Sequence, residues 1–319
     1  MEKRLIPGLA FVAALALAAA PAFAEENRDV RADVALAETA VAAPDPNVVT
    51  DEETPTFIFL TREEHEKALA RQPLARRSVN MTYHGGKIMP SATVKTIFWG
   101  TSWSGSDPKI ADLQSFYSGY NQSHYALASI EYTGSNGQVG STVSLLSPVV
   151  DNTKASGGNS TSAILGEACK WFTGPNDGNA YYAVYTDLPR GNAGFCAWHS
   201  SGSCGGTTVR FAFFWKLDGD AGCDPQDTTT GHPQGLAALA NVSAHELAEA
   251  MTDPGSPGAW YDSSGAENGD KCAWAFNVPS VTFSNNSKWK LQGEWSNAAY
   301  TAGTGYPNRS GQRGCLDGH

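Results

Sequence analysis

Apolar and polar positions follow two different patterns along the chain. From residue 79 onward, short apolar runs bounded by glycine or polar residues alternate with stretches in which apolar positions recur every three to four residues. The first pattern is typical of buried strands and the second of amphipathic helices. We therefore expect an α+β fold with a mixed central sheet and glycine-rich connecting loops.

The strongest strand candidates are rich in β-branched and aromatic residues. They are residues 94–99, 180–186 and 209–217, and the last two are apolar enough to lie in the middle of a sheet. Shorter strands are expected at residues 129–133, 142–146, 280–283 and 288–291.

Helical spacing marks four further segments. A helix is expected from Pro108 onward, where Ile110, Leu113, Phe116 and Tyr120 share one face. Residues 162–172 and 236–252 show the same periodicity, and residues 61–70 predict one short exposed helix.

The first 24 residues have the layout of a secretory signal peptide. Two basic residues precede an apolar stretch at residues 5–20, and the sequence Ala22-Phe23-Ala24 fits a cleavage site. No other run approaches the ~20 apolar residues that a membrane span requires. We therefore expect a secreted protein, extracellular or periplasmic, without a membrane span after cleavage.

Residues 25–78 form a zone of different composition. They hold twelve acidic and seven basic residues and no Gly, Cys, Trp or Tyr, so they cannot bury much surface by themselves. We interpret them as an acidic linker or a pro-segment, and the pair Arg76-Arg77 suits proteolytic processing. All nine Trp, eleven Tyr and six Cys follow in residues 79–319, which we read as a single domain.

Charge and cysteine content narrow the class of protein. The formal net charge of −10 argues against a nucleic-acid partner, which would require a basic surface. Six cysteines behind a signal peptide predict up to three disulfides, and Cys196 and Cys204 enclose a short segment in which they are placed to pair locally.

The most informative chemistry lies on the predicted helix at residues 236–252. His245 and Glu249 are four positions apart, so a helix places both on one face, where they can bind one ion. Glu246 takes the position of the general base in the zinc-peptidase pattern H-E-x-x-H, with Glu in place of the second His. The pattern predicts zinc on His245 and Glu249 with Glu246 as catalytic base, and a solvated surface helix is the alternative.

A catalytic zinc usually has three protein ligands, and the sequence offers several for the third. Asp253 precedes Pro254, which takes it out of helical geometry, and Asp262 lies in the glycine-punctuated loop that follows. We favour these two over His199, in a cysteine-flanked segment that we expect to be a loop.

The same region offers calcium as an alternative to zinc. Asp262, Glu267 and Asp270 resemble an oxygen-ligand calcium site, although their spacing does not match an EF-hand. Four tryptophans in glycine-rich segments have core packing as their expected role and stacking on sugars as the alternative: Trp103, Trp198, Trp260 and Trp274.

Short patches between residues 81 and 315 share a pattern with a known group of secreted proteins. They are the segment MTYHGG at residues 81–86, the strand at 94–100, the cysteine–histidine segment at 194–200, the aromatic strand at 211–223 and the helix at 241–254. Together they resemble the EXORDIUM, or phosphate-induced protein 1, family. The resemblance implies a secreted, cell-wall-associated protein, and the family has no established catalytic activity. This chain is similar to a bacterial-type member that retains a metallopeptidase-like H-E-x-x-E helix.

We therefore expect a zinc-dependent peptidase that acts on peptides or proteins, with residues 25–78 as a candidate inhibitory pro-segment. Two other functions fit the same sequence. One is a non-catalytic extracellular or cell-wall-associated protein that binds a glycan or a partner through aromatic loops. The other is a structural calcium-binding domain.

Overall fold

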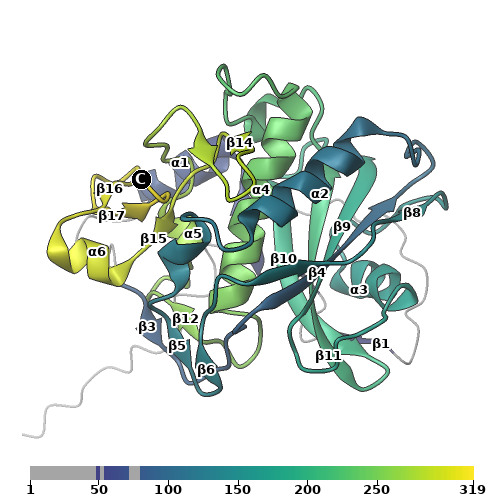
Figure 1. Cartoon of the computed structure of the whole chain (residues 1–319), viewed down its shortest axis with the longest axis horizontal. Coiled ribbons are helices and arrows are strands. Elements are labelled where there is room, and N and C mark those ends of the chain that lie inside the picture. The colour runs from purple at the N-terminus through teal and green to yellow at the C-terminus, as the bar shows by residue number, and fades with distance from the viewer. Residues whose placement is uncertain (1–47, 51–53, 72–79) are drawn as a thin grey trace, which may run out of the picture. The chain divides into compact units, whose positions relative to one another are not determined.

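A mixed sheet of eight strands organises the part of the chain that the computed structural model describes, residues 48–50, 54–71 and 80–319 (Figure 1). The strand order is β1-β10-β11-β9-β4-β7, with β2 also paired to β10 and β8 to β4. The strands are β1 (Val48–Thr50), β2 (Phe57–Leu60), β4 (Ala92–Trp99), β7 (Val143–Leu145), β8 (Val149–Asp151), β9 (Ala180–Pro189), β10 (Phe195–Cys204) and β11 (Thr207–Lys216). The expected α+β fold with a mixed central sheet is confirmed.

Parallel pairing in the middle of the sheet explains the apolar runs in the sequence. Strand β9 pairs in parallel with both β4 and β11, and β10 adds to β11 in antiparallel orientation. Residues of β4, β9 and β11 are buried over most of their length, as parallel strands covered on both faces must be.

Helices cover both faces of the sheet. Alternation along β10 sends neighbouring side chains to opposite faces. Trp198 donates a hydrogen bond to the Gly158 carbonyl, next to α3 (Thr161–Lys170), whereas His199 contacts Glu246 on α4 (Gln234–Thr252). Helix α2 (Pro108–Tyr120) lies beside α4 on the same face (Figure 1).

Helix α4 is buried on every side, from Gly235 to Thr252. A wholly apolar helix in this position would need no hydrogen-bond partners for its side chains. Helix α4, however, carries buried polar side chains, which do require such partners. Ser243 Oγ lies 2.7 Å from the Tyr185 hydroxyl, and Asn241 Oδ1 accepts the Gln292 backbone N–H at 2.8 Å. The remaining polar residues of α4 form the candidate site: His245, Glu246, Glu249 and Thr252.

Short elements follow α4 in the chain, and among them α5 (Asn268–Lys271) and β14 (Lys288–Trp289) contact it (Figure 1). Two small antiparallel pairs are β12 (Trp260–Tyr261) with β3 (Thr82–Tyr83), and β13 (Val281–Thr282) with β14. A third sheet has the order β15 (Glu294–Trp295), β17 (Arg313–Leu316), β16 (Tyr306–Pro307), and the last helix is α6 (Asn297–Ala302). Two further elements are α1 (Arg62–Arg71) and the ribbon of β5 (Thr133–Gly134) and β6 (Gly137–Gln138), and single 3₁₀ turns lie at Ala126–Ser129 and Ala221–Cys223.

The structure corrects two sequence predictions of secondary structure. Residues 195–204 are a ten-residue strand, β10, and not a loop. Their Gly, Ser and Cys residues show no strand pattern, and it is the pairing with β11, β1 and β2 that holds them extended. Residues 129–133 are not a strand: they comprise the end of a 3₁₀ helix, a turn and, at Thr133 alone, the start of β5.

Three disulfides are present, as expected, but the predicted local pair is wrong. Cys169 bonds to Cys204, Cys196 to Cys223, and Cys272 to Cys315. Cys196 and Cys204 sit near opposite ends of β10, about 26 Å apart for an extended strand, so they cannot bond to each other.

Three of the four tryptophans considered for sugar stacking are core residues. Trp103, Trp198 and Trp274 are buried, and Trp260 alone of the four is partly exposed. Of the helices within the described ranges, none has the length and apolar character needed to cross a membrane. The predicted signal peptide at residues 1–24 and the pair Arg76-Arg77 lie outside the described residues.

Candidate metal centre

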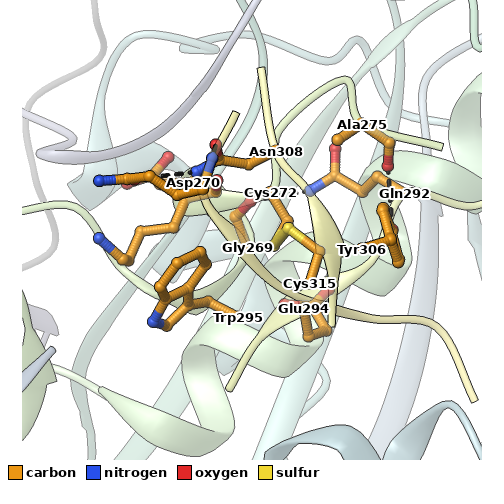
Figure 2. Close-up of a disulfide and its surroundings, with 12 residues drawn as sticks. Gly269, Asp270, Cys272, Ala275, Gln292, Glu294, Trp295, Tyr306, Asn308 and Cys315 are labelled. Carbon is orange, nitrogen blue, oxygen red and sulfur yellow. Dashed lines mark hydrogen bonds between the residues drawn. A yellow bond between two sulfur atoms is a disulfide. The ribbon is translucent and has the colours of Figure 1, made fainter. Parts of the chain in front are cut away.

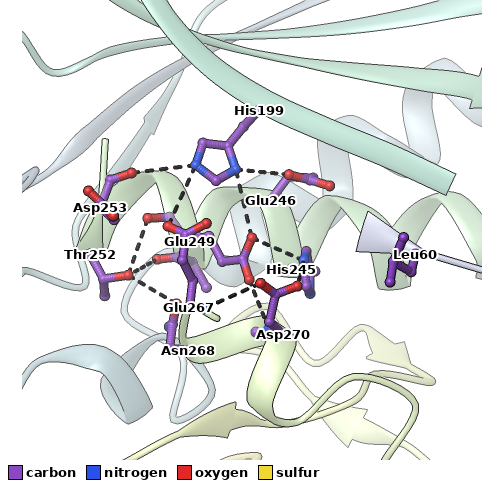
Figure 3. A network of polar contacts seen from close by, with 12 residues as sticks. Leu60, His199, His245, Glu246, Glu249, Thr252, Asp253, Glu267, Asn268 and Asp270 are labelled. Atoms are coloured by element: carbon purple, nitrogen blue, oxygen red, sulfur yellow. Dashed lines mark hydrogen bonds and ion pairs between the residues drawn. The ribbon is translucent and has the colours of Figure 1, made fainter. Parts of the chain in front are cut away.

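Helix α4 presents His245 and Glu249 side by side at the heart of a buried polar cluster (Figure 3). Their spacing of one turn brings His245 Nε2 to 3.0 Å from Glu249 Oε2, and both side chains are fully buried. Within the described part of the chain, His245 Nε2 makes no hydrogen bond in spite of this proximity. A buried nitrogen and oxygen that face each other in this way suit two ligands of one ion.

Asp270, on α5, is the third residue that this pair brings within reach of one ion, whereas Asp253 and Asp262 lie outside this group. Asp270 Oδ1 lies 3.9 Å from His245 Nε2, and the Asp270 backbone N–H donates to Glu249 Oε1 at 2.8 Å. One ligand atom from each of His245, Glu249 and Asp270 lies within 4.8 Å of the others. Ligand atoms of a tetrahedral zinc are about 3.4 Å apart, so this trio fits the ion.

The turn that carries Asp270 fits closely over α4. A Cβ atom on Gly269 would lie 2.6 Å from His245 Nδ1 and 3.0 Å from Glu249 Oε1, so only glycine allows this approach. Gln292, labelled in Figure 2 with Gly269, donates from Nε2 to the Gly269 carbonyl oxygen at 3.0 Å. The same Nε2 lies 3.0 Å from His245 Nδ1, which fixes the imidazole plane. The Cys272–Cys315 disulfide joins the end of α5 to β17.

His199 reaches the same cluster from β10. Its Nδ1 lies 3.0 Å from Glu246 Oε2 and 3.8 Å from Glu249 Oε2, and His199, Glu246 and Glu249 form a second group of potential ligands. The sequence interpretation ranked His199 below two aspartates because it treated the segment as a loop. The sequence gives no strand signal here; only the pairing of β10 with its neighbours shows that residues 197 and 199 point to the α4 face.

The two aspartates favoured by the sequence have other contacts. Asp253 ends α4, and its Oδ1 accepts the Ala259 backbone N–H at 2.7 Å. Asp262 accepts hydrogen bonds from Ser264 and pairs with Lys271 Nζ at 2.9 Å, which places a cation where a metal would have to sit. Neither belongs to the two ligand groups found among the described residues.

Burial and like charge dominate the electrostatics of the cluster. Burial, and next the charges of Glu249, Asp270 and Glu294, raise the pKa of Glu246 well above its ordinary value. Burial also raises the pKa of Glu294 and lowers that of His245 to about 4. Gathered carboxylates of this kind are stabilised by protons or by a cation, and a neutral imidazole is the form of histidine that binds metal.

A strand from the N-terminal part of the chain covers the site. Strand β2 pairs antiparallel with β10, so that Phe57 lies opposite His199 and Phe59 opposite Ala197. The Phe57 ring stacks on His199 at 4.9 Å between centroids, and the Phe59 ring stacks on His245 at 4.1 Å.

We expect the Cys272–Cys315 disulfide to hold α5 against α4. In the double variant Cys272→Ser, Cys315→Ser, the Asp270 amide, which donates to Glu249, should exchange its hydrogen faster, and the free energy of unfolding should fall by about 2–4 kcal/mol. Hydrogen exchange and denaturant titration measure the two effects.

The matched control is Cys169→Ser, Cys204→Ser, because the two disulfides span similar lengths of chain, 43 residues for Cys272–Cys315 and 35 for Cys169–Cys204. It should lose similar stability and leave the Asp270 amide protected, and equal exchange at Asp270 in both variants would contradict the assignment.

No match to this chain is found among protein-family models, curated proteins or solved structures. The proposal below rests on the residues of the site alone.

Proposed function

We propose that this protein is a zinc-dependent peptidase. The observation that carries the proposal is the convergence of His245 Nε2, Glu249 Oε2 and Asp270 Oδ1 beside Glu246, in a site where all but Asp270 are fully buried. Three ligands and an adjacent carboxylate are the parts that metal-assisted hydrolysis of an amide requires.

The donor set favours zinc over calcium. One imidazole nitrogen and two carboxylate oxygens suit zinc, whereas calcium prefers six to eight oxygen ligands. The calcium alternative relied on Asp262, whose carboxylate pairs with Lys271.

In hydrolysis, different residues of this chain would have different roles. Zinc, when bound, polarises the substrate carbonyl and lowers the pKa of water. Glu246 follows His245 on α4 and lies next to Glu249, so we assign it the role of the base that takes a proton from water and returns it to the leaving amine. His199 holds Glu246 through the contact at 3.0 Å and is a positioning residue.

We further propose a location outside the cytoplasm, extracellular or periplasmic. Three disulfides support it, because disulfides persist in oxidising compartments. Membership of the EXORDIUM family is part of the same proposal and is supported by the sequence patches alone.

A non-catalytic role in glycan binding is the second candidate. The feature that favours it is the β3–β12 ribbon, where Tyr83, 42% exposed, lies 5.5 Å from the partly exposed Trp260 ring. Paired aromatic rings at a surface suit stacking on sugars. This role would not use the buried cluster on α4.

Metal content tests the proposed ligands. The protein should bind about one zinc per chain, and His245→Ala and Asp270→Asn should each lose it, because both remove a ligand. Elemental analysis after dialysis against buffered zinc measures the content, with circular dichroism as the check on folding. Asp262→Asn is the matched control and should keep its zinc. Zinc lost in Asp262→Asn but kept in Asp270→Asn would sink the assignment.

Activity tests the proposed base. Glu246→Gln should keep its zinc and lower kcat/KM for hydrolysis of an unfolded protein at least a hundredfold, the range typical of a lost general base. Because Phe59 covers His245, the comparison is made in the unmodified chain and in a Phe57→Ala, Phe59→Ala background. The exposed Glu63→Gln is the control and should change nothing. A zinc-loaded Glu246→Gln with full activity rules out the role.

A further inference from the structure

Strand β2 lies on the sheet edge that borders the candidate site. It extends the sheet at residues 195–199 of β10, while β1 takes the rest of that edge at residues 202–204. The pairing is antiparallel and involves the backbone, so it uses the same groups that an extended peptide from another molecule would use. Leu60, at the end of β2, lies opposite Phe195 of β10.

The two phenylalanines of β2 face the site because they are two positions apart. Phe59 is fully buried and stacks on both His245 and Trp274, at 4.1 Å and 4.9 Å between ring centroids, with interplanar angles of 20° and 19°. Phe57 stacks on His199 at 4.9 Å. The intervening Ile58 points to the other face of the strand. Two aromatic subsites thus lie one residue apart along β10.

Strand β2 therefore covers the imidazoles of His245, one of the proposed ligands, and of His199.

Outside the site, the segment that carries β2 is fastened by polar contacts near its C-terminal end. Helix α1, which follows β2, has no buried residue. Arg62 donates to the Asp224 carbonyl at 2.7 Å and lies over the Trp274 ring. Glu66, 51% exposed, pairs with Arg309, 43% exposed, at 2.5 Å. The backbone N–H of Thr61 donates to the Gly194 carbonyl. Exposed ion pairs of this kind stabilise weakly, so β2 is held largely by the contacts it makes in the site itself.

We propose that β2 is an internal occupant of the peptide-binding cleft, and that the cleft takes extended peptides with aromatic side chains at two positions separated by one residue. The peptide would pair antiparallel with residues 195–199, with one ring between His245 and Trp274 and the other on His199. The inference rests on the proposed peptidase function, for which it names the substrate class. It also makes the chain self-inhibited, because a substrate must displace β2.

Binding of a labelled peptide tests the proposal without any catalysis. The probe is fluorescein-labelled TPTFIFLTR, the sequence of residues 54–62, and its partner probe has Ala in place of both Phe. Anisotropy is measured with the full chain in the presence of a chelator, so that no metal-dependent cleavage occurs. The variant Phe57→Ala, Phe59→Ala should bind the Phe probe at least tenfold more tightly than the unmodified chain does, because its own strand competes less well. The Ala probe should bind that variant at least tenfold more weakly.

Ile58→Ala is the matched control, since it removes apolar surface from the same strand on the opposite face, and it should show no gain in affinity. If the double phenylalanine variant does not fold, Glu66→Ala replaces it, because Glu66 fastens α1 through its ion pair with Arg309; a smaller gain in the same direction is expected. Equal affinity of the unmodified and released chains, or equal binding of the two probes, overturns the proposal. Probe binding without hydrolysis by the zinc-loaded chain would defeat the peptidase function alone, and hydrolysis without aromatic preference would defeat this inference alone.

Discussion

The structure depends on burying several carboxyl groups and two imidazoles in one place. Glu246, Glu249 and Glu294 are fully shielded from solvent, and the charges of Glu249, Asp270 and Glu294 together with burial raise the pKa of Glu246. Such a cluster is unfavourable unless protons or a cation neutralise it. The remaining elements exclude solvent from this cluster and fix the positions of its side chains.

Two constraints bring the proposed ligands together from distant parts of the chain. The H-E-x-x-E spacing on α4 fixes the first two by helical geometry alone. The third depends on the segment after α4, where Gly269 permits contact with His245, Gln292 bonds to that turn, and the Cys272–Cys315 disulfide closes it (Figure 2). The same packing leaves one open side, along β10, and β2 fills it with Phe57 and Phe59.

The sequence predicted those features that follow from local pattern. The buried helix and the apolar strands were recognisable because burial imposes an apolar composition over several consecutive residues. Strand β10 was missed because its Gly, Ser and Cys residues are held extended by neighbours that are distant in sequence. Asp270 was assigned to a calcium loop, because only the folded turn shows that it faces His245 while Asp262 pairs with Lys271. The disulfide pairing likewise depends on contacts between elements that local spacing does not encode.

Anomalous X-ray scattering from crystals of the zinc-loaded protein tests the central claim most directly. The account predicts one peak at the zinc absorption edge, at about 2.0–2.2 Å from His245 Nε2 and from one carboxylate oxygen each of Glu249 and Asp270. A peak bounded by His199, Glu246 and Glu249, or the lack of any zinc peak in this cluster, would contradict it.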